Sequence, residues 1–185
     1  MDSIIRYAAG KLCEFLIPVK HSYYQGKGTK AAICTLGSLD LLEAISYSQD
    51  LMANISIVGR LLSENNGIDA MIRYVIGHPL LNWIILCGND IKGHNAGQTL
   101  LSLFNYGINT GGRICHSTAP YPFLKSSEAD IDIFRKQISV IDLIGNKNVE
   151  EIRSVLKVCL GVHSLHILNI SLRIRYSISH VIIAV

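Results

Sequence analysis

The sequence predicts an α/β fold built on a doubly wound, mainly parallel sheet of about five strands flanked by helices. Short apolar runs that end at a glycine alternate with segments of about ten residues whose apolar positions recur at helical spacing. A strand that is apolar at every position must be covered on both faces, which is typical of parallel sheets. Strands that alternate with helices in this way form βαβ units.

Four apolar runs predict the main strands, and a shorter run predicts a fifth. The run at 83–88 has no polar residue before its glycine, so it predicts the most deeply buried strand. The other main runs lie at 31–36, 54–59 and 140–145, and the short fifth candidate is Arg113–Cys115.

Helical periodicity fills the segments between these runs. Ser127 begins one of them, and the acidic residues that follow it lie where a helix dipole favours negative charge. The predicted helices lie at 39–48, 68–76, 97–106, 127–138 and 148–159. We therefore divide the chain into an N-terminal helix and approach segment (1–28), an α/β domain (29–158) and a C-terminal tail of undefined structure (159–185).

Composition narrows the class of protein. The 185 residues carry a net charge of +3 and are only 17% charged, which is not the basic surface of a nucleic-acid-binding protein. The hydrophobic content of 49% excludes a disordered chain. The five cysteines form no CxxC pair, which is typical of a reduced, cytoplasmic protein and not of a zinc site. We find no signal peptide and no run of about 20 apolar residues, so we expect no transmembrane segment.

The loops that follow the predicted strands are the places to expect a ligand, because open α/β sheets bind ligands at the carboxyl ends of their strands. These loops contain no dinucleotide-binding GxGxxG, no P-loop and no GxSxG nucleophile motif. They are rich in glycine and small polar residues, which suits a ligand that approaches the backbone of several loops. They lie at 35–38, 59–67, 88–98, 115–123 and 145–148.

The loop after the most buried run places His94 between two glycines, just before a predicted helix. Four interpretations of a single histidine there compete. It packs or caps at the helix start, or it acts as a general acid or base with Asp90 or Glu64. A zinc site would need more ligands than this loop offers. Axial ligation of a metal held in a macrocycle needs only one imidazole and a supporting hydrogen bond.

The residues around His94 belong to a longer pattern. Ile84-Ile85-Leu86-Cys87-Gly88 is followed by Ile91-Lys92-Gly93-His94-Asn95-Ala96-Gly97-Gln98. Further motifs occur in order along the chain, within residues 10–158: Thr35–Ser38, Gly59–Ile68, Gly107-Ile108, Gly112–Ile114, Ala119–Leu124, Phe134–Gln137 and Val140–Gly145. The whole set resembles the A-subunit family of tetrahydromethanopterin S-methyltransferase.

The resemblance implies a Rossmann-like domain that binds a corrinoid (a cobamide), with His94 as the axial ligand of its cobalt. In the family, the cobamide accepts a methyl group from methyl-tetrahydromethanopterin, and coenzyme M receives it in a membrane complex coupled to sodium export. Partner methyltransferase subunits are therefore implied, with the methyl-tetrahydropterin donor reaching the corrinoid through a partner. Asp90, Glu64 and a backbone carbonyl are the candidates to bond the other ring nitrogen of His94.

The candidate cofactor-binding residues lie on four of the loops that carry the resemblance. Arg60 and Lys92 either meet the propionamides or the nucleotide-loop phosphate of the cobamide, or are solvated loop charges. The full set is Thr35, Gly37, Ser38, Arg60, Glu64, Asn65, Lys92, Gly93, His94, Gly97, Gln98, Pro120 and Tyr121.

The C-terminal tail departs from the family pattern. The membrane-bound family member carries a C-terminal transmembrane helix, whereas after about Lys157 this chain no longer resembles the family. We therefore expect a cytoplasmic, corrinoid-binding methyl carrier that passes the methyl group to a thiol such as coenzyme M. The alternative is a non-catalytic α/β binding or regulatory module of the same fold that no longer holds corrinoid.

Overall fold

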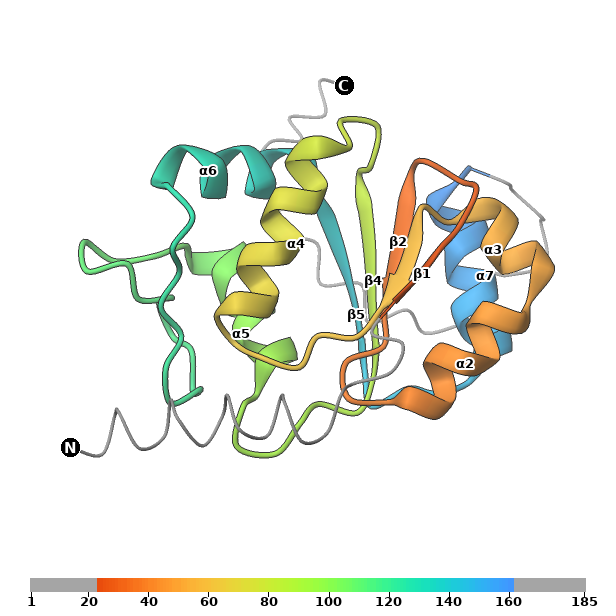
Figure 1. Cartoon of the computed structure of the whole chain (residues 1–185), viewed down its shortest axis with the longest axis horizontal. Helices are drawn as coiled ribbons and strands as arrows, with labels where there is room; N and C mark the ends of the chain where they lie inside the picture. The colour runs from red at the N-terminus through yellow and green to blue at the C-terminus, as the bar shows by residue number, and fades with distance from the viewer. Residues whose placement is uncertain (1–22, 162–185) are drawn as a thin grey trace, which may run out of the picture.

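A computed structural model describes residues 23–161, which form one five-stranded sheet with helices on both faces (Figure 1). The strand order is β1-β3-β2-β4-β5. Strand β1 runs antiparallel to β3, and the other neighbours are parallel. The strands are β1 (Tyr23–Gln25), β2 (Ala31–Cys34), β3 (Ile57–Gly59), β4 (Trp83–Gly88) and β5 (Ser139–Ile144). The predicted doubly wound, mainly parallel α/β fold is confirmed.

The helices divide into two layers, and each layer buries one face of the sheet. One face packs against α4 (Asn66–Gly77), α5 (Ala96–Tyr106) and α6 (Glu128–Gln137). The opposite face packs against α2 (Leu39–Tyr47), α3 (Gln49–Asn54) and α7 (Val149–Cys159). Because successive strand residues point to opposite faces, Ile84 and Leu86 belong to the first core and Ile85 and Cys87 to the second. This two-sided burial explains why the run at 83–88 is apolar throughout.

Side-chain caps fix the starts of two predicted helices. Ser127 accepts a hydrogen bond from Asp130 N at the start of α6. Asn148 accepts bonds from Glu150 N and Glu151 N at the start of α7. Such caps satisfy backbone N–H groups that have no partner inside the helix.

The fifth strand differs from the prediction. Arg113–Cys115 takes part only in isolated bridges, Ile108 with Ile114 and Arg113 with Phe123, so it forms a loop and not a strand. The fifth strand is β1, in the segment expected to be an irregular approach. At Tyr23–Gln25 there is no apolar run to reveal it, because an edge strand of three residues buries little side-chain surface. The strand expected at 54–59 also begins late, since α3 extends to Asn54.

The order of the strands places a topological switch point between β2 and β4. The chain leaves β2 for β3 on one side, then crosses over through α4 to β4 on the other side. The loops after β2 and β4 therefore diverge at the carboxyl edge, where open α/β sheets bind ligands. Gly88 sits where these loops meet, with φ +75°. A Cβ there would lie 2.4 Å from the carbonyl oxygen of Thr35.

Parts of the predicted domain division lie outside the described residues. These are the helix expected before residue 23 and most of the tail from 159 onward. None of the helices in residues 23–161 combines the length and apolar character needed to cross a membrane. The described cysteines, Cys34, Cys87, Cys115 and Cys159, are free thiols. Burial raises the pKa of the Cys34 thiol to about 12.

Candidate functional site

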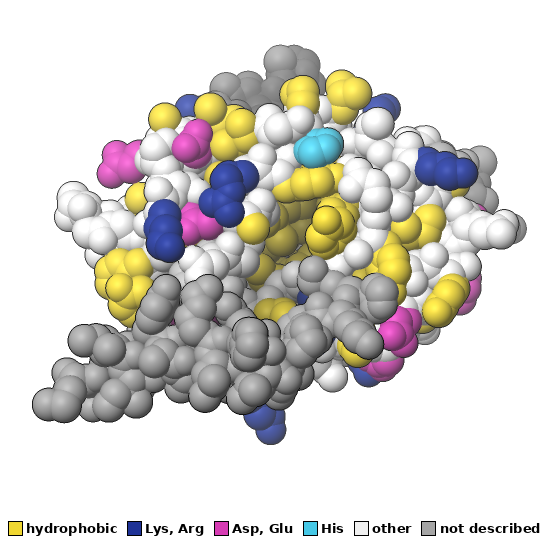
Figure 2. Space-filling model, in the orientation of Figure 1, with side chains coloured by type: hydrophobic (Ala, Val, Ile, Leu, Met, Phe, Trp, Pro, Cys, Tyr) yellow, Lys and Arg dark blue, Asp and Glu magenta, His cyan; other side chains and the backbone are white. Residues whose placement is uncertain are grey.

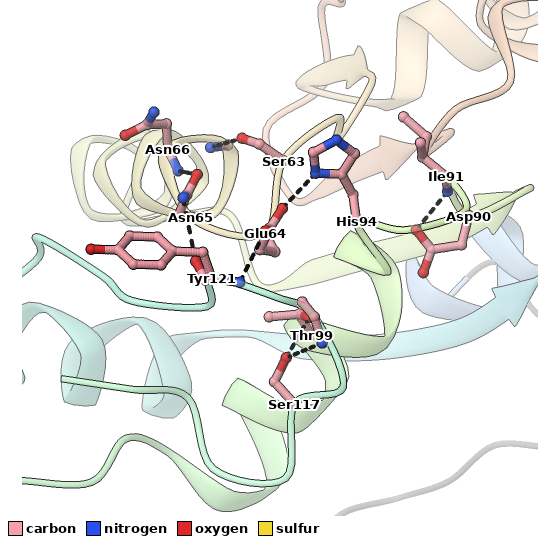
Figure 3. Close-up of polar contacts among 12 residues, drawn as sticks. Ser63, Glu64, Asn65, Asn66, Asp90, Ile91, His94, Thr99, Ser117 and Tyr121 are labelled. Carbon is pink, nitrogen blue, oxygen red and sulfur yellow. Dashed lines mark hydrogen bonds and ion pairs between the residues drawn. The ribbon is translucent and has the colours of Figure 1, made fainter. Parts of the chain in front are cut away.

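His94 lies in the loop between β4 and α5, at the carboxyl edge of the sheet (Figure 3). Asp90 fastens this loop to the helix that follows. Its Oδ2 accepts hydrogen bonds from Gly97 N at 3.0 Å and Gln98 N at 3.1 Å, and its Oδ1 accepts one from Ile91 N at 2.9 Å. The carboxylate thus caps the N-terminus of α5, where negative charge is favoured. Asp90 is therefore occupied by the helix end.

Glu64, from the loop after β3, is the residue that holds the His94 ring. Its Oε2 lies 2.8 Å from His94 Nδ1. The Glu64 side chain is 5% exposed and that of His94 is 52% exposed, so a buried carboxylate holds an imidazole that reaches solvent. Of the ring partners that the sequence left open, Glu64 makes this contact.

The Glu64 carboxylate also binds a third loop, residues 115–124. Tyr121 N donates to Glu64 Oε1 at 3.3 Å, and Asn65 Nδ2 donates to the carbonyl oxygen of Tyr121 at 3.3 Å. The loop after β3, the loop after β4 and the 115–124 loop therefore meet at Glu64 (Figure 3). The Tyr121 ring points away from this junction, and the residue is 63% exposed.

The geometry suits a histidine that binds a metal through one nitrogen. A carboxylate at Nδ1 holds the proton on that atom and leaves the lone pair of Nε2 for a ligand. In Figure 3 the second ring nitrogen points away from Glu64. Before His94 in the chain, Gly93, with φ +88°, has no atom within 4 Å of the position a Cβ would take, and Lys92 is exposed. The loop before His94 is thus open to solvent, as is about half of the His94 side chain.

Other candidates face the protein interior and join loops to one another. Thr35 is fully buried, and its hydroxyl donates to the carbonyl oxygen of Gly59. Ser38 Oγ accepts from Asn89 N at 2.9 Å, and Gly37 N donates to the carbonyl oxygen of Asn89. These residues hold the loop after β2 against the loop after β4. Their side chains do not join the cluster around His94.

Arg60 and Gln98 also make internal contacts. Arg60 Nη2 donates to the carbonyl oxygen of Gly37 at 2.9 Å, and its Nε is buried with no hydrogen-bond partner. Gln98 Oε1 accepts from Thr118 N, and its Nε2 donates to the carbonyl oxygen of His116. Gln98 therefore positions the 115–119 stretch beside α5. Gly97 is packed closely, since a Cβ there would lie 3.0 Å from Asp90 Oδ2.

Two contributors were not found from the sequence. Thr99 and Ser117 share a hydrogen bond of 2.7 Å that joins α5 to the 115–124 loop. The capping role of Asp90 was also missed. The position of Asp90 a few residues before the start of a predicted helix could have indicated this capping role. The Thr99–Ser117 contact could not have been predicted, because it joins two common residue types that belong to no shared motif.

Comparison with known proteins decides the family. The family model MtrA, which describes the A-subunit of tetrahydromethanopterin S-methyltransferase, matches residues 17–167 of this chain. The chain belongs to this family. The resemblance carried by the motifs around His94 is thereby confirmed, and the chain's membership supports a role in methyl transfer.

Individual relatives agree with the family assignment. The A-subunit of a putative methyltransferase, Mtx, from Methanosarcina acetivorans is 34% identical over 142 residues, which is 76% of this chain and 68% of the relative. The A-subunit of tetrahydromethanopterin S-methyltransferase from Methanocaldococcus jannaschii is 33% identical over 131 residues, 70% of this chain and 52% of the relative. The second such A-subunit of Methanothermobacter thermautotrophicus is 30% identical over 131 residues, 70% of this chain and 68% of the relative. The matched region thus spans about half of the M. jannaschii protein.

The family assignment gives the geometry a context. The relatives are named as methyltransferase subunits, so the chemistry in which this family takes part is the transfer of a one-carbon group. The paired Glu64 and His94 lie within the matched residues.

Proposed function

We propose that this protein is a corrinoid-binding methyl carrier, with the corrinoid over the carboxyl edge of the sheet and His94 Nε2 as the axial ligand of its cobalt. The observation that carries the proposal is the hydrogen bond between Glu64 and His94 Nδ1. It fixes the ring and leaves the outward nitrogen for the metal. When bound, a corrinoid supplies a cobalt centre that takes a methyl group from a methyl-tetrahydropterin and gives it to a thiol such as coenzyme M.

Glu64 is the positioning residue in this proposal. A buried carboxylate bonded to Nδ1 increases the basicity of Nε2, which strengthens it as a ligand. Its second bond, from Tyr121 N, keeps the carboxylate from following the ring if the ring moves. Glu64 thus sets both the orientation of the imidazole and its strength as a ligand.

The remaining candidates divide by exposure. Lys92, Gly93, Pro120 and Tyr121 are exposed on the loops around His94, and Asn65 is half-buried beside them; we assign these residues to direct contact with the corrinoid or its side chains. Lys92, as an exposed cation, suits the propionamides or the nucleotide-loop phosphate. Thr35, Gly37, Ser38, Arg60, Gly97 and Gln98 hold the loops in register beneath it.

A partner completes the proposed reaction. The relatives are named as one subunit each of a methyltransferase, so we assign donor binding to a partner methyltransferase subunit. The partner would carry the methyl-tetrahydropterin to the bound corrinoid.

The test is the visible absorbance of the full chain after incubation with cobalamin and removal of free cobalamin. We expect the protein to keep a corrinoid whose bands differ from those of free cobalamin, and His94→Ala to lose or shift them. His78→Ala is the matched control. His78 lies at the C-terminus of α4, whereas Glu64 lies just before its N-terminus, and the His78 ring bonds the carbonyl oxygen of Tyr74.

Two outcomes would contradict the proposal. A colourless wild-type protein would favour the non-catalytic binding or regulatory module. Identical bands and retention in wild type and His94→Ala would remove His94 as the ligand.

A further inference from the structure

A cavity of about 600 Å³ lies between α4 and the part of the sheet formed by β1, β3 and β2. Figure 2 shows it as a hollow with hydrophobic side chains around it. Buried residues of the sheet, among them Ala32, Cys34 and Ile84, form its inner wall, whereas Tyr23 and Ala70 are exposed and lie at its opening. Cavities of about 300–1,000 Å³ are typical of sites that bind a small molecule.

Arg60 is the only charged residue among the described residues that line this cavity. Its Nη2 donates to a backbone carbonyl oxygen at 2.9 Å, and its Nε is buried with no hydrogen-bond partner. None of the ion pairs among the described residues includes Arg60. Its acidic neighbours in the chain are used elsewhere, since Glu64 contacts His94 and Asp69 accepts a hydrogen bond from Ser126. Within the part of the chain that the structure describes, the guanidinium therefore has no counter-charge.

The chemistry of the lining defines the class of ligand. Tyr74 Oη already shares a hydrogen bond of 2.7 Å with Ser56 Oγ, so it is not free to orient a ligand. A partly buried cation is desolvated without compensation, and an anion placed beside it supplies the missing partner. The planar fork of a guanidinium suits the oxygens of an acidic group. The apolar walls disfavour a ligand that is polar throughout.

We propose that this cavity binds a small molecule with an apolar body and one anionic group, and that Arg60 holds the anionic group. The body lies against Ile57 and Met71, which line the cavity and are partly buried. Removal of apolar surface from water supplies most of the binding free energy, and the cation orients the ligand. The site is separate from the proposed corrinoid position, since no described residue of the loop that carries His94 lines it.

The test is fluorescence titration of the full chain with two probes that share one aromatic body. Anilinonaphthalene sulfonate carries a negative charge, and phenylnaphthylamine is the same molecule without the sulfonate. We expect both probes to bind, and the sulfonate to bind about tenfold or more tightly than the neutral probe, because a hydrogen bond to a charged group contributes about that much. These titrations need no corrinoid, so their outcome is independent of the proposed function.

Variants of Arg60 isolate the contribution of its charge. Arg60→Gln should remove the preference for the sulfonate and leave the affinity for the neutral probe within about twofold of wild type. Arg60→Lys keeps a positive charge and should retain a preference for the sulfonate. Arg73→Gln is the matched control, because Arg73 is an exposed residue of α4 outside the lining, and it should bind both probes as wild type.

A second pair of variants locates the probes in the cavity. Ala70 is an exposed residue of α4 that lines the cavity, so the large side chain of Ala70→Trp should fill the opening. We expect the affinity for both probes to fall by about tenfold or more. Arg73→Trp places the same side chain on the same helix outside the lining and should leave both affinities unchanged.

Four results would overturn the proposal. The wild-type chain binds neither probe, or it binds the two with equal affinity. Arg60→Gln keeps the preference for the sulfonate. Ala70→Trp binds both probes as wild type, which would place them elsewhere on the protein. Saturating cobalamin displaces the sulfonate in equilibrium dialysis, which would assign the cavity to the corrinoid; we expect the probe to stay bound.

Discussion

Glu64 and His94 join the loop after β3 to the loop after β4, across the end of β2, through a hydrogen bond of 2.8 Å. The two loops follow strands that are not neighbours in the sheet. Their contact therefore bridges the carboxyl end of β2, next to the topological switch point. The exposed ring is thereby anchored to a side chain that is almost wholly buried.

Replacing Glu64 with glutamine should weaken corrinoid binding. The amide keeps the shape of the side chain but removes the charge that holds the proton on His94 Nδ1. Loss of such a supporting group typically reduces metal affinity by about 10- to 100-fold. Titration of the apoprotein with cobalamin, followed by absorbance, measures the change. Glu43→Gln, at an exposed position of α2, should bind as wild type. Unchanged affinity in Glu64→Gln would contradict the role given to the carboxylate.

Replacing Asp90 with alanine should destabilise the protein through α5. The change removes the acceptor for Gly97 N and Gln98 N, which then have no helix partner. Loss of an N-terminal cap costs about 1–2 kcal/mol of unfolding free energy. Urea denaturation measures this, with Asp132→Ala at an exposed position of α6 as the control. Equal stability of the two variants would show that Asp90 does not hold the helix start.

Gly88→Ala and Gly77→Ala should differ sharply in stability. At Gly88 a Cβ would lie 2.4 Å from the carbonyl oxygen of Thr35, at a positive φ. Strain and overpacking should together cost about 3 kcal/mol or more. At Gly77, in α4, nothing lies within 4 Å of the new Cβ. Alanine there should change stability by at most about 1 kcal/mol, and in the stabilising direction. Thermal or urea unfolding compares the pair, and similar losses would contradict the close approach of the two loops.

The buried Cys34 thiol should make stability fall at high pH. Burial raises its pKa from 9.0 to about 12. Above about pH 9 the unfolded chain therefore releases the proton before the folded one does, so the unfolding free energy decreases as pH rises toward 12. Cys34→Ala should flatten this decline relative to wild type between about pH 8 and pH 11 in urea denaturation. Parallel profiles would mean that the thiol titrates normally in the folded chain.

The fold could be predicted because its main signal is burial on both faces. The runs that became β2, β4 and β5 are apolar for that reason, and their order with the helices defines the doubly wound sheet. Strand β1 gave no such signal, since its residues are held mainly by backbone pairing with β3. Ile114 is buried in the core formed with α4, α5 and α6, but Arg113–Cys115 pairs only through isolated bridges, so it does not form the strand that was predicted there.

The site could be predicted only in part from the sequence. His94 stands out through its glycine-flanked motif, and Glu64 and Asp90 were both available as its partner. The choice between them is set by three-dimensional placement: Asp90 is close to α5 in the chain and caps it, whereas Glu64 reaches His94 only because β3 and β4 flank β2. Contacts such as Gln98 with Thr118 depend on the path of a long loop, which no local pattern determines.

The short antiparallel strand β1 also bears on how the protein avoids aggregation. An unpaired strand edge offers its backbone groups to other chains, and long flat edges invite them to pair. At the β1 side the sheet ends in only three residues, after which Gly26 N donates to the carbonyl oxygen of Ser56 and Gly28 N to that of Ile55. Within the described residues, this edge strand is therefore short and continues into a turn that is bonded to the chain's own backbone, which limits the length over which a foreign strand could pair with it.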